Sequence, residues 1–178
     1  DKYDLLSADV LTIYPLSAPR MVDGKQIDVV IRIHEELRIL GLKTKLVVCN
    51  AHANATKERD EARARATNDV IFTSLEEAPT YDQGVPSKVV SDLFRLSNVF
   101  IFPTTSENSS LCLAEAMLSG NLLILNADVP TLREHAGDGN ATPTAQAAYA
   151  AAQMLSAACS HIKEALGSRE HVAGKKKL

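Results

Sequence analysis

Short, mostly apolar runs alternate along the chain with longer segments in which apolar residues recur every three or four positions. Unbroken apolar runs are typical of strands buried inside a parallel sheet, and the longer periodic segments are typical of amphipathic helices. The predicted strands are Val10–Tyr14, Lys45–Asn50, Asp69–Thr73, Val99–Phe102 and Leu122–Leu125. Their alternation with helical segments predicts an α/β domain with a parallel sheet.

The first predicted helix runs from about Lys25 to Leu40, and Gly41 is well placed to end it. The side chains that would face the sheet are Ile27, Val30, His34 and Leu37. We interpret His34 on this stripe as a core-edge residue with satisfied hydrogen bonds rather than as a ligand.

The other segments are predicted from charge, proline and alanine content. We expect an exposed helix rich in ion pairs at Thr56–Thr67, a long loop suited to ligand binding at Ser74–Gly84, and a helix that Pro86 begins at Pro86–Ser97. A loop followed by a crossover helix is expected at Pro103–Gly120, a short helix after Pro130, and a packed C-terminal helix at Thr144–Leu166.

Length and charge exclude several functional classes. The 178 residues suit one domain, and 19 basic against 22 acidic residues argue against nucleic acid or an acidic membrane as partner. Three widely spaced cysteines, Cys49, Cys112 and Cys159, favour reduced thiols. No apolar run is long enough to predict a transmembrane segment. We therefore expect a cytoplasmic protein, either free or peripheral to a membrane.

Two acids, Glu107 and Glu115, stand eight residues apart where the predicted loop after Phe102 passes into a helix. Eight helical residues span roughly 12 Å, whereas the carboxyl pairs of glycoside hydrolases lie about 5–9.5 Å apart. A two-carboxylate hydrolase is therefore disfavoured, and each acid is expected to hold a different part of one extended ligand. The apolar neighbours of Glu115 suggest a setting in which its charge needs a partner.

Further binding groups surround these acids. Asn108, Ser109 and Ser110 can cap the helix, and the backbone N–H groups of Ser109–Cys112 can face an anion. Arg20 and Lys25 bracket the loop after the first strand and could neutralise a diphosphate without a metal. In a parallel sheet these loops share the rim at the carboxyl ends of the strands.

Together these motifs resemble those of the group 1, glycogen-synthase-like retaining glycosyltransferases. Arg20 to Lys25 resembles the family's donor-phosphate loop, and Glu107 to Glu115 resembles its pair of acids separated by seven residues. The match continues through Glu115–Gly120 and from Leu122 to Glu134. The resemblance implies a Rossmann-like three-layer αβα sandwich with a parallel sheet of five or six strands. Residues 1–178 would be the C-terminal, nucleotide-sugar-binding domain of the two-domain GT-B fold, with 144–178 as a C-terminal helix and tail.

The resemblance also implies roles for individual residues. Arg20 and Lys25 would hold the diphosphate of a UDP-, GDP- or ADP-sugar without a metal or other cofactor. Glu107 would bind the transferred sugar and Glu115 the ribose hydroxyls, while the base would lie near the Ser74–Pro86 loop. The backbone amides that would meet sugar and phosphate oxygens belong to Asn108, Ser109, Ser110, Leu111 and Cys112. The acceptor site would belong to an N-terminal domain that this chain does not contain.

Three departures from the family pattern keep alternatives open. Asn108-Ser109-Ser110 replaces a Gly-Phe-Gly-like segment, Pro19 stands where a glycine is usual, and the apolar strand expected soon after Gly139 is not visible. One alternative is a non-catalytic nucleotide or nucleotide-sugar binding module of Rossmann-like fold. An NAD-dependent enzyme is a weaker one, because no G-x-G-x-x-G follows the first strand.

Overall fold

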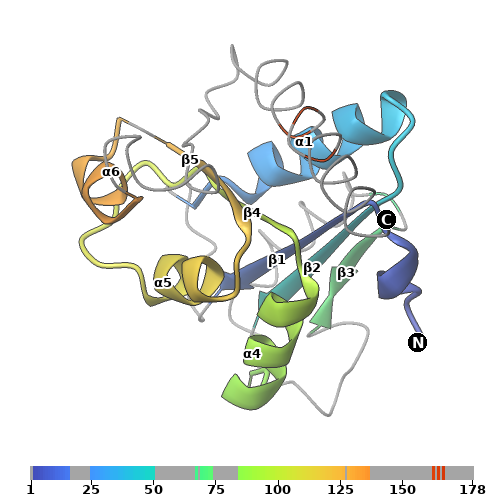
Figure 1. The fold of residues 1–178 in the computed structure, drawn as a ribbon, viewed down its shortest axis with the longest axis horizontal. Coiled ribbons are helices and arrows are strands. Elements are labelled where there is room, and N and C mark those ends of the chain that lie inside the picture. Colours follow the sequence, from blue (N-terminus) through green and yellow to red (C-terminus); the bar gives the residue numbers. More distant parts are fainter. Residues whose placement is uncertain are drawn as a thin grey trace, which may run out of the picture.

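The computed structural model describes residues 2–16, 25–50, 67, 69–73, 84–126, 128–136, 162, 164 and 166. Within them, five strands form one sheet whose neighbouring strands are all parallel (Figure 1). The strands are β1 (Val10–Leu16), β2 (Thr44–Asn50), β3 (Val70–Phe72), β4 (Val99–Phe102) and β5 (Leu122–Leu125). The predicted α/β fold with a parallel sheet is confirmed, and the ends of β4 and β5 agree residue for residue with the prediction.

The order of the strands creates a switch point in the middle of the sheet. The order is β3-β2-β1-β4-β5, so the chain builds outward from β1 in one direction and then returns to build outward in the other. The switch point lies between β1 and β4, and open α/β sheets bind their ligands at the carboxyl edge beside such a point.

Helices cover both faces of the sheet. Helix α1 (Ile27–Ile39) contacts β2, while α4 (Ser87–Leu96) contacts β1 and α5 (Leu111–Leu118) contacts β4 and β5. Figure 1 shows α1 on one side of the sheet and α4 and α5 on the other. The three-layer αβα arrangement is therefore confirmed. The remaining described elements are the short helix η1 (Leu5–Ser7) and α6 (Pro130–Ala136), which follows β5.

The core agrees with the apolar pattern, and one of its buried polar residues, His34, lies on the predicted stripe of α1. Val30 and Leu37 of the predicted α1 stripe are fully buried, and Ile27 is half-buried. Gly41 has a φ of 88° and follows α1, as expected for a glycine that ends a helix. His34 is buried, but within the described part of the chain neither ring nitrogen has a hydrogen-bond partner. The prediction of satisfied hydrogen bonds for His34 is therefore wrong, because the helix turns this side chain into an apolar layer.

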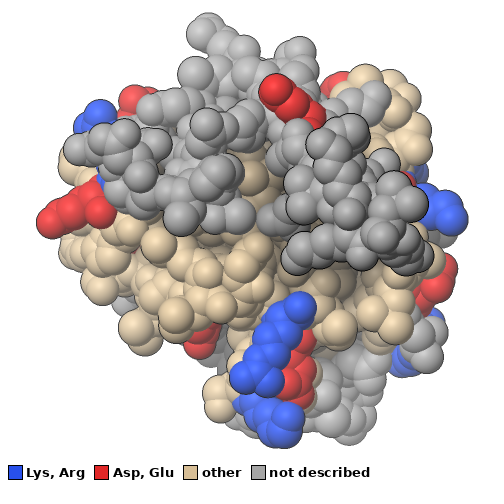
Figure 2. Space-filling view, in the orientation of Figure 1, with Lys and Arg blue, Asp and Glu red and all other residues tan. Residues whose placement is uncertain are grey.

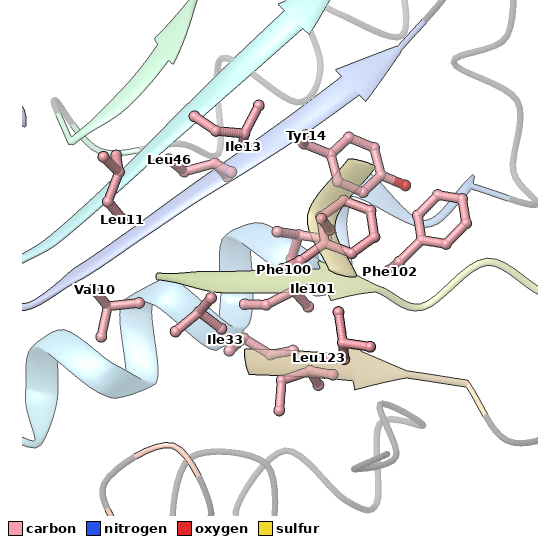
Figure 3. Packing of buried hydrophobic residues seen from close by; sticks show 14 of the residues in the cluster. Val10, Leu11, Ile13, Tyr14, Ile33, Leu46, Phe100, Ile101, Phe102 and Leu123 are labelled. Atoms are coloured by element: carbon pink, nitrogen blue, oxygen red, sulfur yellow. The ribbon is translucent and has the colours of Figure 1, made fainter. Parts of the chain in front are cut away.

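Aromatic side chains fill the core beneath the carboxyl edge. Phe94 of α4 lies 5.7 Å from Phe100, which stacks on Phe102 at 5.4 Å between ring centroids. Tyr14 lies 6.2 Å from Phe102, and Figure 3 shows these two rings at the arrowhead ends of β1 and β4. The core thus ends in two aromatic rings directly below the loops that carry the predicted site.

Several predicted segments lie wholly or largely outside the described residues. These are the helix Thr56–Thr67, the loop after the first strand, the loop Ser74–Gly84 and most of the helix Thr144–Leu166. Ile162, Glu164 and Leu166 are helical, and Ile162 is buried in the core. Over the residues the structure describes, no helix is both long and apolar enough to cross a membrane.

Candidate functional site

The carboxyl edge brings together residues that follow three different strands. Lys25 follows the loop after β1, Glu107 follows β4, and Thr131 lies in the first turn of α6 after β5. Lys25 and Glu107 are 82 residues apart in sequence, yet their side chains form an ion pair with Nζ 2.8 Å from Oε2. Only 18% and 17% of the two side chains are exposed. The structure therefore joins two of the predicted site residues directly.

The position of Lys25 is set by two aromatic residues. The Tyr14 hydroxyl donates a hydrogen bond to the backbone carbonyl of Lys25, and the Lys25 ammonium lies 5.2 Å from the centroid of the Phe102 ring. Burial raises the pKa of Tyr14 well above its ordinary value, so the phenol remains a neutral donor. A cation over an aromatic face is attracted by the negative face of the ring. Tyr14 thus holds the backbone of Lys25, while Phe102 supports its charge.

The loop that carries Glu107 is tied to the loop after β5. Thr131 donates from its hydroxyl to the backbone carbonyl of Glu107. Nearer the start of the same loop, Asn126 donates a hydrogen bond from Nδ2 to the Thr104 carbonyl at 3.1 Å, and the Thr104 hydroxyl donates to the Ser106 carbonyl at 2.9 Å. The backbone on both sides of Ser106 is therefore fixed by bonds that do not involve the Glu107 carboxylate.

Sequence reasoning missed Tyr14, Phe102, Asn126 and Thr131 as supporting residues of the site. Asn126 and Thr131 follow the end of β5, so the rule that placed Glu107 on the rim would also have selected them. Tyr14 and Phe102 gave no such signal, because apolar and aromatic residues at strand ends are ordinary core residues.

Of the three residues predicted to cap α5, Ser110 makes the capping hydrogen bond. Ser110 is buried, and its hydroxyl accepts a hydrogen bond from the Leu113 backbone N–H at 3.1 Å. Asn108 and Ser109 are exposed, and the Asn108 N–H donates to Oε1 of Glu107 at 3.3 Å. Ser110 is therefore the N-cap, whereas Asn108 contacts the carboxylate of the candidate site.

Leu111 and Cys112 begin α5 beside Glu107. Their N–H groups belong to the first turn, which a helix leaves without intrahelical partners and which favours anions. The Leu111 side chain is 79% exposed. Burial, together with the charges of Glu115 and Glu107, raises the pKa of the half-buried Cys112 thiol to about 11. Cys112 is therefore a protonated thiol near neutral pH, and its contribution to anion binding is restricted to its backbone.

Glu115 lies on the outer face of α5, one helical turn beyond Leu111. Its side chain is exposed, so the expected apolar setting is wrong. Leu113 and Ala116 turn inward and are buried, which leaves Glu115 on the opposite face of the helix. The proposed contact of Glu115 with a ribose stays a prediction. Arg20 lies outside the described residues, and so its position relative to Lys25 also stays a prediction.

No protein-family model matches the sequence, and no curated protein matches it significantly. Solved structures do resemble the fold. The catalytic domain of starch synthase IV from Arabidopsis thaliana, bound to ADP and acarbose, superposes with a TM-score of 0.56 at 16% identity, over 91% of this chain and 34% of that one. The pneumococcal O-GlcNAc transferase GtfA, in complex with UDP and GlcNAc, gives 0.51 at 19% identity, over 89% and 27%.

An E. coli trehalose-6-phosphate structure bound with UDP-2-fluoro glucose gives a TM-score of 0.56 at 11% identity, over 75% of this chain and 32% of that one. The chain shares its fold with part of these glycosyltransferase structures. The expected GT-B type of Rossmann-like domain is therefore confirmed at the level of the fold. The chain spans about a third of the length of each of these structures.

Proposed function

We propose that the chain is the donor-binding half of a retaining glycosyltransferase that transfers a hexose from a nucleoside-diphosphate sugar. The observation that carries the proposal is the meeting of Lys25 and Glu107 beside the start of α5, at the carboxyl edge of the sheet. A cation, an anion-favouring helix terminus and a carboxylate are the groups needed for a diphosphate joined to a sugar. Structures that share the fold hold UDP, ADP or UDP-2-fluoro glucose.

Each group has a distinct task in this proposal. Lys25, with Arg20, would hold the diphosphate and stabilise the negative charge that grows on the nucleotide as the bond to the sugar breaks. Because two cationic side chains would supply this stabilisation, the proposed reaction uses no metal. Glu107 would accept hydrogen bonds from sugar hydroxyls and stabilise the positive anomeric carbon. Glu115 would accept hydrogen bonds from the ribose.

The acceptor site and the remaining catalytic groups would come from an N-terminal domain of the same protein. We therefore expect this chain to bind the donor and to turn it over poorly. The even balance of charge and the scattered cysteines favour a cytoplasmic protein, and peripheral association with a membrane would be a property of the full-length protein.

Titration calorimetry with UDP-, GDP- and ADP-sugars tests the proposal. We expect one nucleotide class to bind, and the double variant Arg20→Ala/Lys25→Ala to weaken its binding at least ~30-fold because two charge-assisted contacts are lost. The matched control is Lys88→Ala/Arg95→Ala, which removes two exposed cations from α4 (Figure 2). Equal affinities in the wild-type chain and the Arg20/Lys25 variant would refute the phosphate assignment.

A further inference from the structure

In this structure, the two groups that the proposed function assigns to different parts of the donor bind each other. Lys25 Nζ and Glu107 Oε2 lie 2.8 Å apart in a partly buried pair. We infer that this ion pair is a switch that the diphosphate opens: the phosphate takes over Lys25, and the released Glu107 carboxylate turns to the sugar. The inference rests on the proposed function and adds an order of events to it.

The ion pair can open without movement of the backbone, because hydrogen bonds outside the pair hold the backbone at Lys25 and at Glu107. The Tyr14 hydroxyl fixes the carbonyl of Lys25, and the hydroxyl of Thr131 fixes that of Glu107. Gln26, next to Lys25, has a φ of 50°, a left-handed conformation that the surrounding structure must hold in place. Opening the pair therefore requires only rotation of two side chains.

Each partner of the ion pair also makes a second contact. The Lys25 ammonium lies 5.2 Å from the centroid of the Phe102 ring, and Oε1 of Glu107 accepts a hydrogen bond from the Asn108 N–H at 3.3 Å. A lysine offers three donors on a flexible stem, so it can exchange one anion for another without leaving the site. These contacts lower the cost of breaking an ion pair that water reaches only in part.

Electrostatic attraction favours transfer of the Lys25 ammonium group from the Glu107 carboxylate to the diphosphate. A diphosphate carries more negative charge than one carboxylate, so it competes effectively for the ammonium group. Once it binds, the Glu107 carboxylate has lost its cationic partner and needs a new donor. Sugar hydroxyls supply that donor, whereas a nucleoside diphosphate without sugar does not.

The switch predicts opposite effects of one substitution on two ligands. Glu107→Gln removes the competitor for Lys25, so we expect the affinity for the nucleoside diphosphate to rise about fivefold, the size of a modest ion-pair coupling. The same substitution removes a charged acceptor from the sugar subsite, so the affinity for the intact nucleotide sugar should fall. Glu107→Asp should strengthen binding of the nucleoside diphosphate by a smaller factor, since the shorter side chain weakens the pair.

Titration calorimetry with this chain tests the switch in a double-mutant cycle. UDP, GDP and ADP are titrated into the wild-type chain, Glu107→Gln, Lys25→Met and the combined variant. In the Lys25→Met background, Glu107→Gln should change the affinity by less than about twofold, because the gain acts through Lys25. Glu36→Gln, which neutralises an exposed carboxylate of α1, is the control for charge and should have no effect.

The possible outcomes separate the switch from the proposed function. An unchanged or lower affinity of Glu107→Gln for the nucleoside diphosphate would overturn the switch. A gain that persists in the Lys25→Met background would also overturn it, because simple repulsion between carboxylate and phosphate would then explain the gain. If the wild-type chain and all variants bind none of the three nucleotides, the proposed function fails, and the switch fails with it.

Discussion

At the amino edge of the sheet, Asn98 and Asn121 bond to backbone groups, whereas at the carboxyl edge Lys25 and Glu107 bond to each other. Asn121 is 2% exposed and donates from Nδ2 to the carbonyls of Phe94 and Ala116 at 3.0 and 3.3 Å. Its Oδ1 accepts from the hydroxyl of Ser97 at 2.7 Å. The amide of Asn121 therefore joins α4 and α5 beneath the sheet.

Asn98 makes the equivalent connection between β4 and β1. Its Nδ2 donates to the Asp9 carbonyl at 2.7 Å, and its Oδ1 accepts from the Leu11 N–H at 3.0 Å. The backbone partners of Asn121 hold it in place, because leaving their buried carbonyl groups unpaired would be costly, whereas Asn98 makes its backbone bonds at a less buried position. The pair of Lys25 and Glu107 stays partly accessible, so each partner can be exchanged for a ligand atom. The asparagines at the amino edge therefore stabilise the fold through backbone bonds, whereas the ion pair at the carboxyl edge can exchange its partners for a ligand.

Removing the amide of Asn121 should have the largest effect on stability. Asn121→Ala leaves buried partners in α4 and α5 without this amide, so we expect the free energy of unfolding to fall by about 2–3 kcal/mol in urea titrations. Asn108→Ala is the matched control at the carboxyl edge, where the side chain is exposed, and should cost less than about 0.5 kcal/mol. Similar losses in both variants would contradict the contrast between the edges.

His34 provides a buried polar group without a partner among the described residues, and it should make stability depend on pH. Burial lowers the pKa of His34 from 6.5 to about 4, opposed by the charge of Asp69. Between these values the unfolded chain binds more protons than the folded chain, so stability rises with pH. The contribution of His34 is complete above pH 6.5 and is lost as the pH falls toward 4.

Between pH 7 and pH 5 we expect the free energy of unfolding to fall by about 2 kcal/mol because of His34. His34→Leu should remove this dependence, and His135→Gln, an exposed residue of α6, should keep it. Urea titrations at both pH values measure the difference. A slope that survives in His34→Leu would show that other groups cause it.

Two adjacent serines at the carboxyl edge sharpen the comparison, because only one of them bonds to the backbone of α5. Ser110→Ala removes the N-cap bond to the Leu113 N–H and should cost about 1 kcal/mol. Ser109→Ala changes an exposed side chain and should be close to neutral. Thermal unfolding measures the melting temperatures of the two variants, and equal values would contradict the assignment of Ser110 as the N-cap.

The smallest effect on stability is expected for the ion pair itself. Glu107→Gln should lower the free energy of unfolding by less than about 1 kcal/mol, since partly exposed ion pairs contribute little and the backbone bonds of this loop remain. Chemical denaturation of Glu107→Gln and Lys25→Met measures this. A loss of several kcal/mol would identify Glu107 as a structural carboxylate rather than a functional one.

Local pattern was sufficient to predict the elements that the core buries. The runs Val99–Phe102 and Leu122–Leu125 agree with β4 and β5 residue for residue, because a short unbroken apolar run is typical of a strand buried on both faces of a parallel sheet. The end of α1 at Gly41 was predictable because a glycine adopts positive φ at little cost. The spacing of Glu107 and Glu115 also placed both acids correctly around the start of α5.

The sequence by itself determined the strands, the helix that follows Glu107 and the rim on which Lys25 and Glu107 lie, because the apolar runs and the helical periodicity that predict them are patterns of residues close together along the chain. The tertiary structure alone decided that Lys25 meets Glu107, that Thr131 holds the Glu107 loop, and that His34 is buried without a partner in the described residues. Such contacts depend on the strand order, which places the carboxyl ends of β1, β4 and β5 next to one another, and no local pattern encodes that order.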